Sequence, residues 1–392
     1  MHVSHLAFTN VRTFRHLELD LGPGIHVIAG ENAQGKSNLL DAVQMLATTR
    51  TLRSGADLDL ITWDALRDDP LPAARMEATV ETRQGRRLLE IAVIAGETMP
   101  GVRATRASRR LRVNGIARRA SDLVGQLRVV MFSADDLSII DGPPVNRRRY
   151  MDITISQLDP AYLRALQRYA RVLEQRNSLL RRLAERRGRP DELDFWDDEL
   201  AEAGAIIVGA RAEAIRRLAR DAATTYASLA ATETEDLAVC YEPRLPDDLP
   251  GATREHDFAE RFRAALGRER TEDIRRGMTR WGPHRDDVQF LIGGHTASVS
   301  ASRGQQRTAA LALRLAEIEL STARTGDPPV LLLDDILSEL DPGRRQRVLS
   351  VAYAVDQVLI TTPDADHPSR EELPGARRYT LASGVITAQR ED

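Results

Sequence analysis

Cysteine is almost absent from this chain, which has one, Cys240, in 392 residues. A single cysteine excludes an intramolecular disulfide framework and is typical of a reducing compartment. No segment approaches the roughly 20 uninterrupted apolar residues that a membrane span needs, and the first residues lack the charged-then-apolar pattern of a signal peptide. We therefore expect a cytoplasmic protein that does not enter a membrane.

Lysine is nearly as rare as cysteine. Of the 55 lysine and arginine residues, Lys36 is the one lysine, which indicates a position where arginine cannot serve. The formal net charge of −3 excludes a uniformly basic coat for nucleic acid, but it leaves room for a local basic patch. The surroundings of the lone lysine are therefore the first indication of chemistry.

The chain is longer than the about 250–300 residues that one hydrophobic core usually serves, which indicates two or three domains. The N-terminal part shows the alternation and short apolar runs of strands, with one helix among them. We expect strands near 17–21, 25–29, 76–80 and 88–94, a helix at 38–47, and a hairpin with an Asn-Gly turn at 111–116. The C-terminal part predicts a helix at 307–320 and buried strands at 330–333 and 358–360.

The middle of the chain is predicted to be helical. Apolar side chains recur at three- and four-residue steps over 160–187 and again over 196–214, and Arg176 interrupts the first series. Residues 188–190, Gly-Arg-Pro, separate the two segments, which predicts an antiparallel hairpin of two helices, each reaching roughly 40 Å. A projecting arm and an ordinary packed helical domain explain this pattern equally well.

Residues 30–37, Gly-Glu-Asn-Ala-Gln-Gly-Lys-Ser, fit the P-loop pattern between a predicted strand and a predicted helix. The glycines let backbone amides curl around phosphate oxygens, Lys36 offers a compact charge to the β- and γ-phosphates, and Ser37 offers a hydroxyl to Mg²⁺. The planar fork of arginine cannot replace an ammonium in such a loop, which explains the surviving lysine. The candidate nucleotide-binding residues here are Gly30, Glu31, Asn32, Ala33, Gln34, Gly35, Lys36 and Ser37.

The apolar strand at 330–333 ends in two carboxylates, Asp334 and Asp335. Alone this is an ordinary strand end, but together with a P-loop it is the Walker B arrangement. Asp334 would then hold Mg²⁺ together with Ser37, directly or through water, and Asp335 would orient the attacking water. The candidate catalytic residues are Lys36, Asp334 and Asp335.

Ser302, Gly304 and Gln305 open a predicted helix with the pattern Ser-x-Gly-Gln. Taken alone, this pattern is explained by a simple N-cap at Ser302. Ser302 lies 32 residues before Asp334, however, and this spacing is typical of ABC-type ATPase heads. In those heads the signature contacts the γ-phosphate bound by a partner subunit. Residues 338–341, Ser-Glu-Leu-Asp, match the D-loop that follows Walker B.

The P-loop and this signature are 265 residues apart, far more than in a transporter ATPase. The head is therefore split by an insertion, as in SMC-type ATPases. We expect an α/β fold, an ABC-type ATPase head of the P-loop NTPase class assembled from both chain ends, residues 1–145 and 281–392. An inserted, mostly helical lobe at 146–280 would carry the short antiparallel helical hairpin.

Over nearly its full length the chain resembles the RecF family of bacterial DNA replication and repair proteins. The resemblance rests on the P-loop interior, on 302–307 and 333–341, and on further short motifs. These motifs are 10–15 (Asn-Val-Arg-Thr-Phe-Arg), 132–137 (Phe-Ser-Ala-Asp-Asp-Leu), 147–152 (Arg-Arg-Arg-Tyr-Met-Asp) and 282–287 (Gly-Pro-His-Arg-Asp-Asp). The last of them is the most specific to the family.

The resemblance implies that ATP and Mg²⁺ drive head-to-head homodimerisation, in which residues 30–37 of one subunit meet Ser302 to Gln305 of the other. The closed dimer would bind double-stranded DNA and double-strand/single-strand junctions, and weak, DNA-stimulated ATP hydrolysis would reset it. The resemblance also implies a role in the recombinational repair of gaps and in the SOS response, with RecR and RecO as partners.

Several positions depart from the general ABC pattern. Asp335 stands where most ABC ATPases carry a glutamate, and its shorter reach predicts slow hydrolysis. Residues 361–362, Thr-Thr, follow the strand after which transporters carry a switch histidine, which leaves the γ-phosphate sensor unassigned. The Q-loop glutamine is also unassigned: Gln126 is near in sequence, but the segment 132–133 is favoured.

Three alternatives stay open from the sequence. Another SMC-like ATPase, for example one that serves a nuclease, would share the split head, although a single cysteine excludes a zinc hook and the hairpin is short. A transporter-type ABC ATPase would lack the insertion. An ATP-gated scaffold with negligible turnover would keep the same motifs.

DNA contacts are predicted only for regions. Seven arginines and no acidic residue lie between 103 and 119, and 147–149 is a second basic cluster. Such clusters can neutralise phosphates, but a solvated surface of an arginine-rich protein explains them equally well. Without interleaved aromatic residues, binding would be directed at the DNA backbone. The seven residues are Arg103, Arg106, Arg109, Arg110, Arg112, Arg118 and Arg119.

Overall fold

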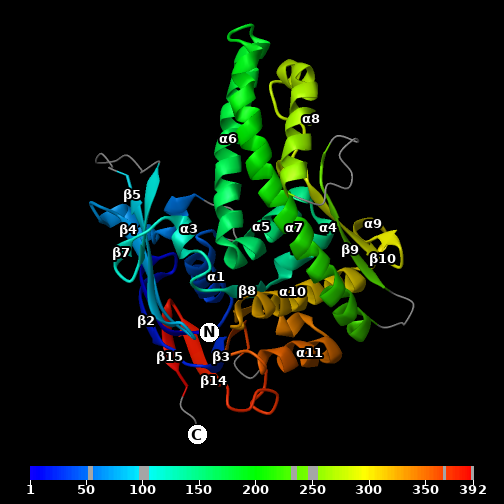
Figure 1. Ribbon diagram of the computed structural model, residues 1–392. Helices are drawn as coiled ribbons and strands as arrows, with labels where there is room; N and C mark the ends of the chain where they lie inside the picture. Colours follow the sequence, from blue (N-terminus) through cyan, green and yellow to red (C-terminus); the bar gives the residue numbers. More distant parts are fainter. Residues whose placement is uncertain (52–55, 97–105, 231–235, 246–254, 365–367, 390–392) are drawn as a thin grey trace. The chain divides into compact units, whose positions relative to one another are not determined.

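The computed structural model describes the chain except residues 52–55, 97–105, 231–235, 246–254, 365–367 and 390–392. The chain folds as two compact units (Figure 1), one made of Met1–Asp136 and Leu311–Asp392 and the other of Leu137–Ala310. The segments 137–145 and 281–310, which the sequence placed in the ATPase head, thus pack with the inserted segment. Strand pairing explains this for the second segment, because β10 (Asp287–Ile292) pairs with β9 (Leu237–Glu242).

The first unit contains an antiparallel sheet with the strand order β2-β1-β4-β5-β6-β7. Its strands are β1 (His2–Val11), β2 (Phe14–Asp20), β4 (Ala73–Thr82), β5 (Gly85–Ala95), β6 (Ala107–Val113) and β7 (Ile116–Ala117). Apolar residues alternate with polar ones along these strands, so one face of the sheet is apolar and packs against the hydrophobic core. The expected hairpin is confirmed, since Asn114 and Gly115 both have the positive φ that a type I′ turn requires.

A second, mostly parallel sheet in this unit has the strand order β15-β14-β3-β13-β12-β8. Its strands are β3 (Gly24–Ala29), β8 (Val129–Phe132), β12 (Val330–Asp334), β13 (Gln357–Thr362), β14 (Arg377–Ala382) and the antiparallel β15 (Val385–Ala388). Continuous apolar runs in β8, β12 and β13 match burial on both faces. Because these strands are parallel, their carboxyl ends meet at one edge of the sheet.

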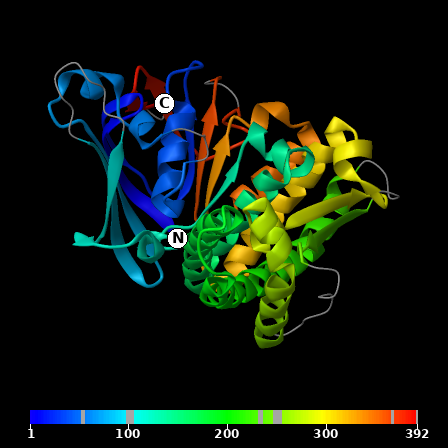
Figure 2. The same cartoon turned by 90° about the horizontal axis from the view of Figure 1, so that it is seen from above.

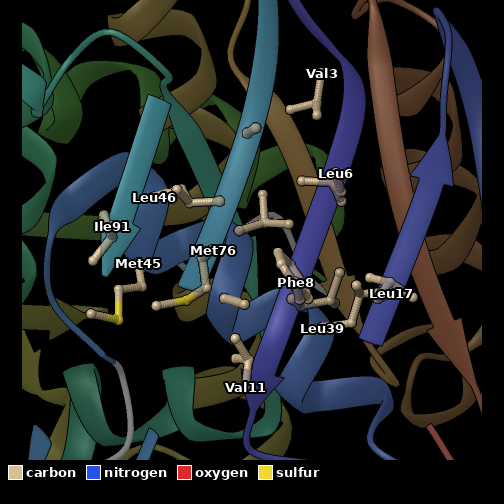
Figure 3. Close-up of a cluster of buried hydrophobic side chains, with 14 of the residues drawn as sticks. Val3, Leu6, Phe8, Val11, Leu17, Leu39, Met45, Leu46, Met76 and Ile91 are labelled. Atoms are coloured by element: carbon tan, nitrogen blue, oxygen red, sulfur yellow. The ribbon is translucent and has the colours of Figure 1, made fainter. Parts of the chain in front are cut away.

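Helix α1 (Lys36–Thr48) lies between the two sheets (Figure 2). Its apolar residues Leu39, Met45 and Leu46 are fully buried and pack with side chains of the antiparallel sheet, such as Phe8 and Met76 (Figure 3). This core fixes the helix at the end of β3. The other helical segments of the unit are Asp57–Leu60, α2 (Trp63–Asp68), α3 (Ala120–Leu123), Ala134–Asp136, Leu337–Glu339 and α11 (Pro342–Ala352).

The second unit is mostly helical, as expected. Its helices are α4 (Leu137–Asp141), α5 (Pro144–Leu158), α6 (Pro160–Ala184), α7 (Leu193–Leu229), α8 (Glu255–Arg276) and α9 (Ala297–Ser300). Short helical turns at Pro190–Glu192 and Pro283–Arg285 and a small sheet of β9, β10 and β11 (His295–Thr296) complete it. Helix α10 (Arg303–Thr325) begins here and contributes its residues from Leu311 onward to the first unit.

The predicted hairpin is present, but it is not a simple two-helix arm. Helices α6 and α7 run antiparallel, as the Arg168–Glu199 and Arg182–Glu192 ion pairs show. Helix α7 has 37 residues and is therefore about 55 Å long, more than the sequence indicated. The unpredicted helix α8 lies beside both of them (Figure 1).

Arg176 explains why a charged residue interrupts the apolar series of α6. Its side chain is fully buried and its guanidinium binds Asp197 of α7 (2.7 Å) and Asp273 of α8 (2.9 Å). Burying an arginine costs free energy unless its donors are paired, and here carboxylates from both neighbouring helices pair with it. The residue thus joins the three helices. Among the residues that the structure describes, no helix is both long and apolar enough to cross a membrane.

Candidate nucleotide-binding site

The predicted P-loop follows β3 and leads into α1, as the sequence indicated. Two of its glycines are required by their surroundings: a Cβ on Gly30 would collide with the Leu381 carbonyl oxygen, and one on Gly35 would collide with the Thr13 hydroxyl. Gly35 also has φ 105°, and Ala33 has φ 66°. Such conformations turn successive backbone amides toward one concave side, as a phosphate-binding loop needs.

Lys36 lies beneath this loop and is 7% exposed. Its ammonium donates hydrogen bonds to the carbonyl oxygens of Gly30 (2.5 Å) and Glu31 (2.9 Å). Burial lowers the pKa of Lys36, and the carboxylates of Asp335 and Asp334 oppose this shift. The lone lysine is therefore held among acceptors at the N-terminus of α1, where the helix dipole also favours an anion.

The structure brings the two Walker B carboxylates to the same place. The Ser37 hydroxyl donates to Asp334 Oδ1 (2.9 Å), and the Thr361 hydroxyl donates to the same oxygen (2.8 Å). Asp335 follows at the end of β12 with φ 55°, and its carboxylate accepts a hydrogen bond from Ser338 (3.2 Å). Lysine, hydroxyl and carboxylates thus converge at the carboxyl edge of the parallel sheet.

The donor set fits a magnesium ion. Mg²⁺ prefers hard oxygen ligands in an octahedron at 2.0–2.1 Å, so that two neighbouring ligands lie about 2.9 Å apart. Ser37 Oγ and Asp334 Oδ1 have this separation. These two atoms are the ones that the sequence proposed for the metal.

Sequence reasoning did not foresee how the rim of the loop is held. The Arg12-Thr13 turn between β1 and β2 packs against it, with Asn38 donating to the Thr13 hydroxyl (3.3 Å). The Gln34 side chain accepts from the backbone amide of Ser383 (2.6 Å), in the turn between β14 and β15. Glu31, Asn32 and Ala33 stay exposed at the tip. The motif at 10–15 therefore supports the P-loop, a role that no local pattern reveals.

The signature residues belong to the second unit, at the start of α10. Ser302 and Gln305 form a reciprocal capping box, in which the Gln305 amide donates to Ser302 Oγ (3.2 Å) and the Ser302 amide to Gln305 Oε1 (2.7 Å). Arg303 pairs with Asp141 of α4, and Gln306 donates to the Ala297 carbonyl oxygen (2.9 Å). The N-cap that explained the pattern locally is thus real.

The segment favoured for the Q-loop lies at the same sheet edge as Walker B, because Phe132 pairs with Leu333. The amide of Ser133 donates to Asp136 Oδ2 (3.0 Å), and Arg314 of α10 binds the same carboxylate at Oδ1 (2.7 Å). Gln126 is engaged elsewhere, since its amide donates to the Asp122 carbonyl oxygen (3.0 Å). The placement supports 132–133 over Gln126.

The arginine clusters proposed for DNA are partly used within the fold. Arg147 makes a bidentate pair with Asp287 (2.6 and 2.9 Å), and Arg148 donates to the Asp286 carbonyl oxygen (2.8 Å). These two are therefore structural residues. In the first cluster Arg109 binds Asp57 and Arg112 faces Glu90. Arg103 lies outside the described residues, and the other four are exposed: Arg106, Arg110, Arg118 and Arg119.

The motif at 282–287 is the centre of a buried polar network in the second unit. Asp286 is fully buried, and its carboxylate accepts from Arg211 of α7 (3.0 Å), from the Tyr241 hydroxyl and from the Arg244 amide (2.8 Å). Arg211 also binds Asp152 of α5 (2.8 Å). The motif thus ties β9 and β10 to the helices rather than forming a surface site.

His284 of this motif is partly buried and neutral. Its Nε2 donates to the Thr279 carbonyl oxygen (3.1 Å), so Nδ1 accepts from the Tyr169 hydroxyl (2.8 Å). Burial lowers the pKa of His284 to about 4, and nearby arginines such as Arg285 contribute to the shift. The folded form therefore resists protonation at pH values where an unfolded histidine accepts a proton.

We expect the second unit to lose stability as the pH falls from about 6.5 to about 4. In this range the unfolded chain binds the proton and the folded chain does not, so the free energy of unfolding falls with pH. The difference between the two pKa values corresponds to about 3 kcal/mol, which is present above pH 6.5 and lost below pH 4. Urea unfolding at pH 7 and 4.5 measures it, with His284→Gln as the comparison because its amide keeps the Thr279 bond. An equal loss in both proteins would contradict the assignment.

The comparisons with known proteins agree with this geometry. The profile of the RecF/RecN/SMC N terminal domain family matches residues 2–372. The DNA replication and repair protein RecF of Chloroflexus aggregans is 42% identical over 394 residues, which covers 99% of this chain and 100% of that protein. A solved structure of "the recombination mediator protein RecF-ATP in RecFOR pathway" is 29% identical, with a TM-score of 0.84, and the match covers 99% of this chain and 97% of that one.

A more distant likeness concerns the fold alone. The SMC head domain of Pyrococcus furiosus is 13% identical, with a TM-score of 0.53 over 99% of this chain and 96% of that one. The expected α/β fold of an ABC-type head with an insertion is thereby confirmed. The 42% identity to a RecF protein over the full length of both chains favours the RecF family over a transporter ATPase and over another SMC-like ATPase. The chain belongs to the RecF family.

Proposed function

We propose that this chain is an ATP-dependent DNA-binding protein of recombinational repair and replication-gap processing, acting in the cytoplasm. The observation that carries the proposal is the convergence of Lys36, Ser37 and Asp334 at one sheet edge, in a chain whose relatives are named DNA replication and repair proteins. ATP and Mg²⁺ are the ligands that this constellation fits.

Each residue of the site has a separate part in the proposed chemistry. The loop amides and Lys36 bind the phosphates, and Ser37 and Asp334 would hold Mg²⁺, which neutralises charge on the β- and γ-phosphate oxygens when bound. Asp335 orients the attacking water from the end of β12. Because an aspartate reaches less far than a glutamate, hydrolysis should be weak, and we expect DNA to stimulate it.

ATP-dependent homodimerisation is the second part of the proposal. Gly304 supports it, since a Cβ there would meet the Ser302 hydroxyl only at 3.8 Å and its φ is not left-handed. Gly304 lies in the first turn of α10, and no described atom of this chain comes close enough to its Cβ position to require a glycine. A nucleotide bound by the partner subunit would approach Ser302, Gly304 and Gln305 closely. This approach would explain why the position carries a glycine.

The proposed targets are double-stranded DNA and double-strand/single-strand junctions, recognised through the phosphate backbone. The exposed Arg106, Arg110, Arg118 and Arg119 are the described members of the first basic cluster that suit this role. RecR and RecO are the proposed protein partners, because the similar solved structure is described within the RecFOR pathway. A role in the SOS response goes with that pathway.

Binding to a gapped duplex at moderate salt tests this function. We expect tight binding by the wild type with ATP, and at least tenfold weaker binding with ADP or for Lys36→Met with ATP. Asp335→Asn with ATP should bind at least as tightly as the wild type and dissociate more slowly, because it retains ATP. Affinity should fall as salt rises, as phosphate contacts require. Equal DNA binding in all four experiments would show that ATP binding does not control DNA binding. No DNA binding in any of them would overturn the proposal.

A further inference from the structure

Thr361 is the first of the two threonines, 361–362, at the end of the strand after which a transporter-type head carries its switch histidine. It lies at the carboxyl end of β13, where it pairs in register with Asp334 of β12 on one side and Ile28 of β3 on the other. Its side chain is 2% exposed. Thr361 is therefore buried at the carboxyl end of the sheet, next to the Walker B residue Asp334, and does not lie on the surface of the site.

The hydrogen bonds of the Thr361 hydroxyl have a definite direction. Oγ1 accepts from the backbone amide of Asp335 (3.2 Å), so its own proton is free to be donated. Two acceptors lie near it, Asp334 Oδ1 at 2.8 Å and the Leu333 carbonyl oxygen at 3.4 Å. The shorter bond goes to a carboxylate and is charge-assisted, so the proton belongs to Asp334.

This bond holds the carboxylate in one orientation. Asp334 Oδ1 accepts from both Ser37 and Thr361, and neither of these bonds involves Oδ2. Ser37 offers its hydroxyl to Mg²⁺ in the proposed chemistry. When it does so, the bond from Thr361 is the contact that keeps Asp334 oriented. Partners of this kind, behind a metal ligand, typically change metal affinity or activity by about 10- to 100-fold when they are removed.

Thr361 also holds the second carboxylate residue. The Asp335 amide donates to both the carbonyl oxygen and the hydroxyl of Thr361, each at 3.2 Å. Asp335 has φ 55°, a conformation that aspartate tolerates better than most residues but that still costs about 1 kcal/mol or more. The two bonds to Thr361 offset this cost and fix the direction in which Asp335 leaves the strand.

We propose that Thr361 is a positioning residue that sets both Walker B carboxylates, Asp334 for Mg²⁺ and Asp335 for the attacking water. This inference rests on the proposed function of the site as an Mg²⁺-ATPase. It assigns to the threonine a role behind the acids, in place of a γ-phosphate sensor.

The chain offers a matched control one residue further on. Thr362 is equally buried, but its hydroxyl donates to the Asp364 carbonyl oxygen (3.2 Å) and accepts from the Asp364 amide (3.3 Å). These bonds form a local turn and do not reach Asp334 or Asp335. Thr362→Val therefore removes a buried hydroxyl from the same strand end without touching either carboxylate.

The test is the Mg²⁺ dependence of nucleotide binding, measured by titrating a fluorescent ATP analogue at a series of Mg²⁺ concentrations and in EDTA. For Thr361→Val we expect the half-saturating Mg²⁺ concentration to rise about 10- to 100-fold, with unchanged affinity in EDTA. Thr361→Ser, which restores the hydroxyl, should return within about threefold of the wild type, and Thr362→Val should match the wild type. ATP turnover should fall in Thr361→Val alone among the three.

The outcomes separate two failures. If the wild type shows no Mg²⁺-dependent nucleotide binding, the proposed function is wrong. If the wild type shows it and Thr361→Val has the same Mg²⁺ dependence, the positioning role alone is overturned. Thermal melting of each variant verifies folding, and Thr361→Ala replaces Thr361→Val if the latter does not fold, with the same expected shift.

Discussion

Replacing Lys36 by arginine is expected to abolish ATP binding although the positive charge is kept. The Lys36 ammonium fits beneath the P-loop within 2.5 Å of the Gly30 carbonyl oxygen and 2.9 Å of the Glu31 carbonyl oxygen. A guanidinium is larger and planar, so it would displace these carbonyl groups and lose the point contact with the phosphates. In the proposed complex the ammonium would donate to the β- and γ-phosphates, and two such charge-assisted hydrogen bonds contribute about 3 kcal/mol or more. Losing them corresponds to a loss of at least about 100-fold in ATP affinity.

Equilibrium binding of a fluorescent ATP analogue measures this effect. Lys36→Met should lose a similar amount, because it fills the same space without a charge. Arg110→Lys is the matched control, since it makes the reverse exchange on an exposed strand residue and should bind ATP as the wild type does. ATP binding by Lys36→Arg within tenfold of the wild type would show that charge alone suffices. The loop geometry would then no longer explain why this chain keeps one lysine.

Removing Arg211 is expected to destabilise the second unit by about 3–5 kcal/mol. The side chain is 2% exposed and binds Asp286, Asp152 and the Pro283 carbonyl oxygen at 3.0, 2.8 and 2.7 Å. Breaking a buried ion pair from one side leaves the opposite charge in a medium of low dielectric constant, and that penalty is the source of the loss. Arg211→Met keeps the volume and leaves two carboxylates without their shared cation.

Urea unfolding in a Trp63→Phe background follows this unit, because the remaining tryptophans, Trp196 and Trp281, both lie in it. Arg217→Met on the same helix is the control, since Arg217 pairs with Glu213 at the surface and should cost no more than about 0.5 kcal/mol. Equal effects of the two substitutions would mean that the buried network contributes no more than a surface pair.

The parts of the fold that the sequence predicted are those with local signals. The strand before the P-loop, helix α1, the hairpin at Asn114 and the buried strand β12 all carry their pattern within about ten residues. The chemistry of the P-loop and Walker B motifs can also be predicted from short stretches of sequence. Their convergence required the additional rule that parallel strands end at one edge of a sheet.

The parts that the sequence did not predict depend on distant partners. Arg176 read as an interruption of α6, because its partner Asp273 lies 97 residues away on a helix that the pattern did not indicate. Arg147 read as a candidate DNA contact, because its partner Asp287 lies 140 residues away. Thr361 read as an unassigned sensor, since nothing in the sequence shows which oxygen its hydroxyl meets. In each case the role assigned to a polar residue changes once its hydrogen-bond or ion-pair partner is known.

The rarity of lysine has a practical consequence for chemistry done on this protein. A reagent or an enzyme that modifies lysine side chains has one target in the chain, Lys36, and that amine is 7% exposed beneath the P-loop. Acylation found on the peptide that contains Lys36, as distinct from acylation of the N-terminal amine, is therefore a modification of the nucleotide site, and its rate reports how accessible that site is. Bound nucleotide should protect the amine from such labelling, so the extent of acylation would serve as a built-in gauge of site occupancy.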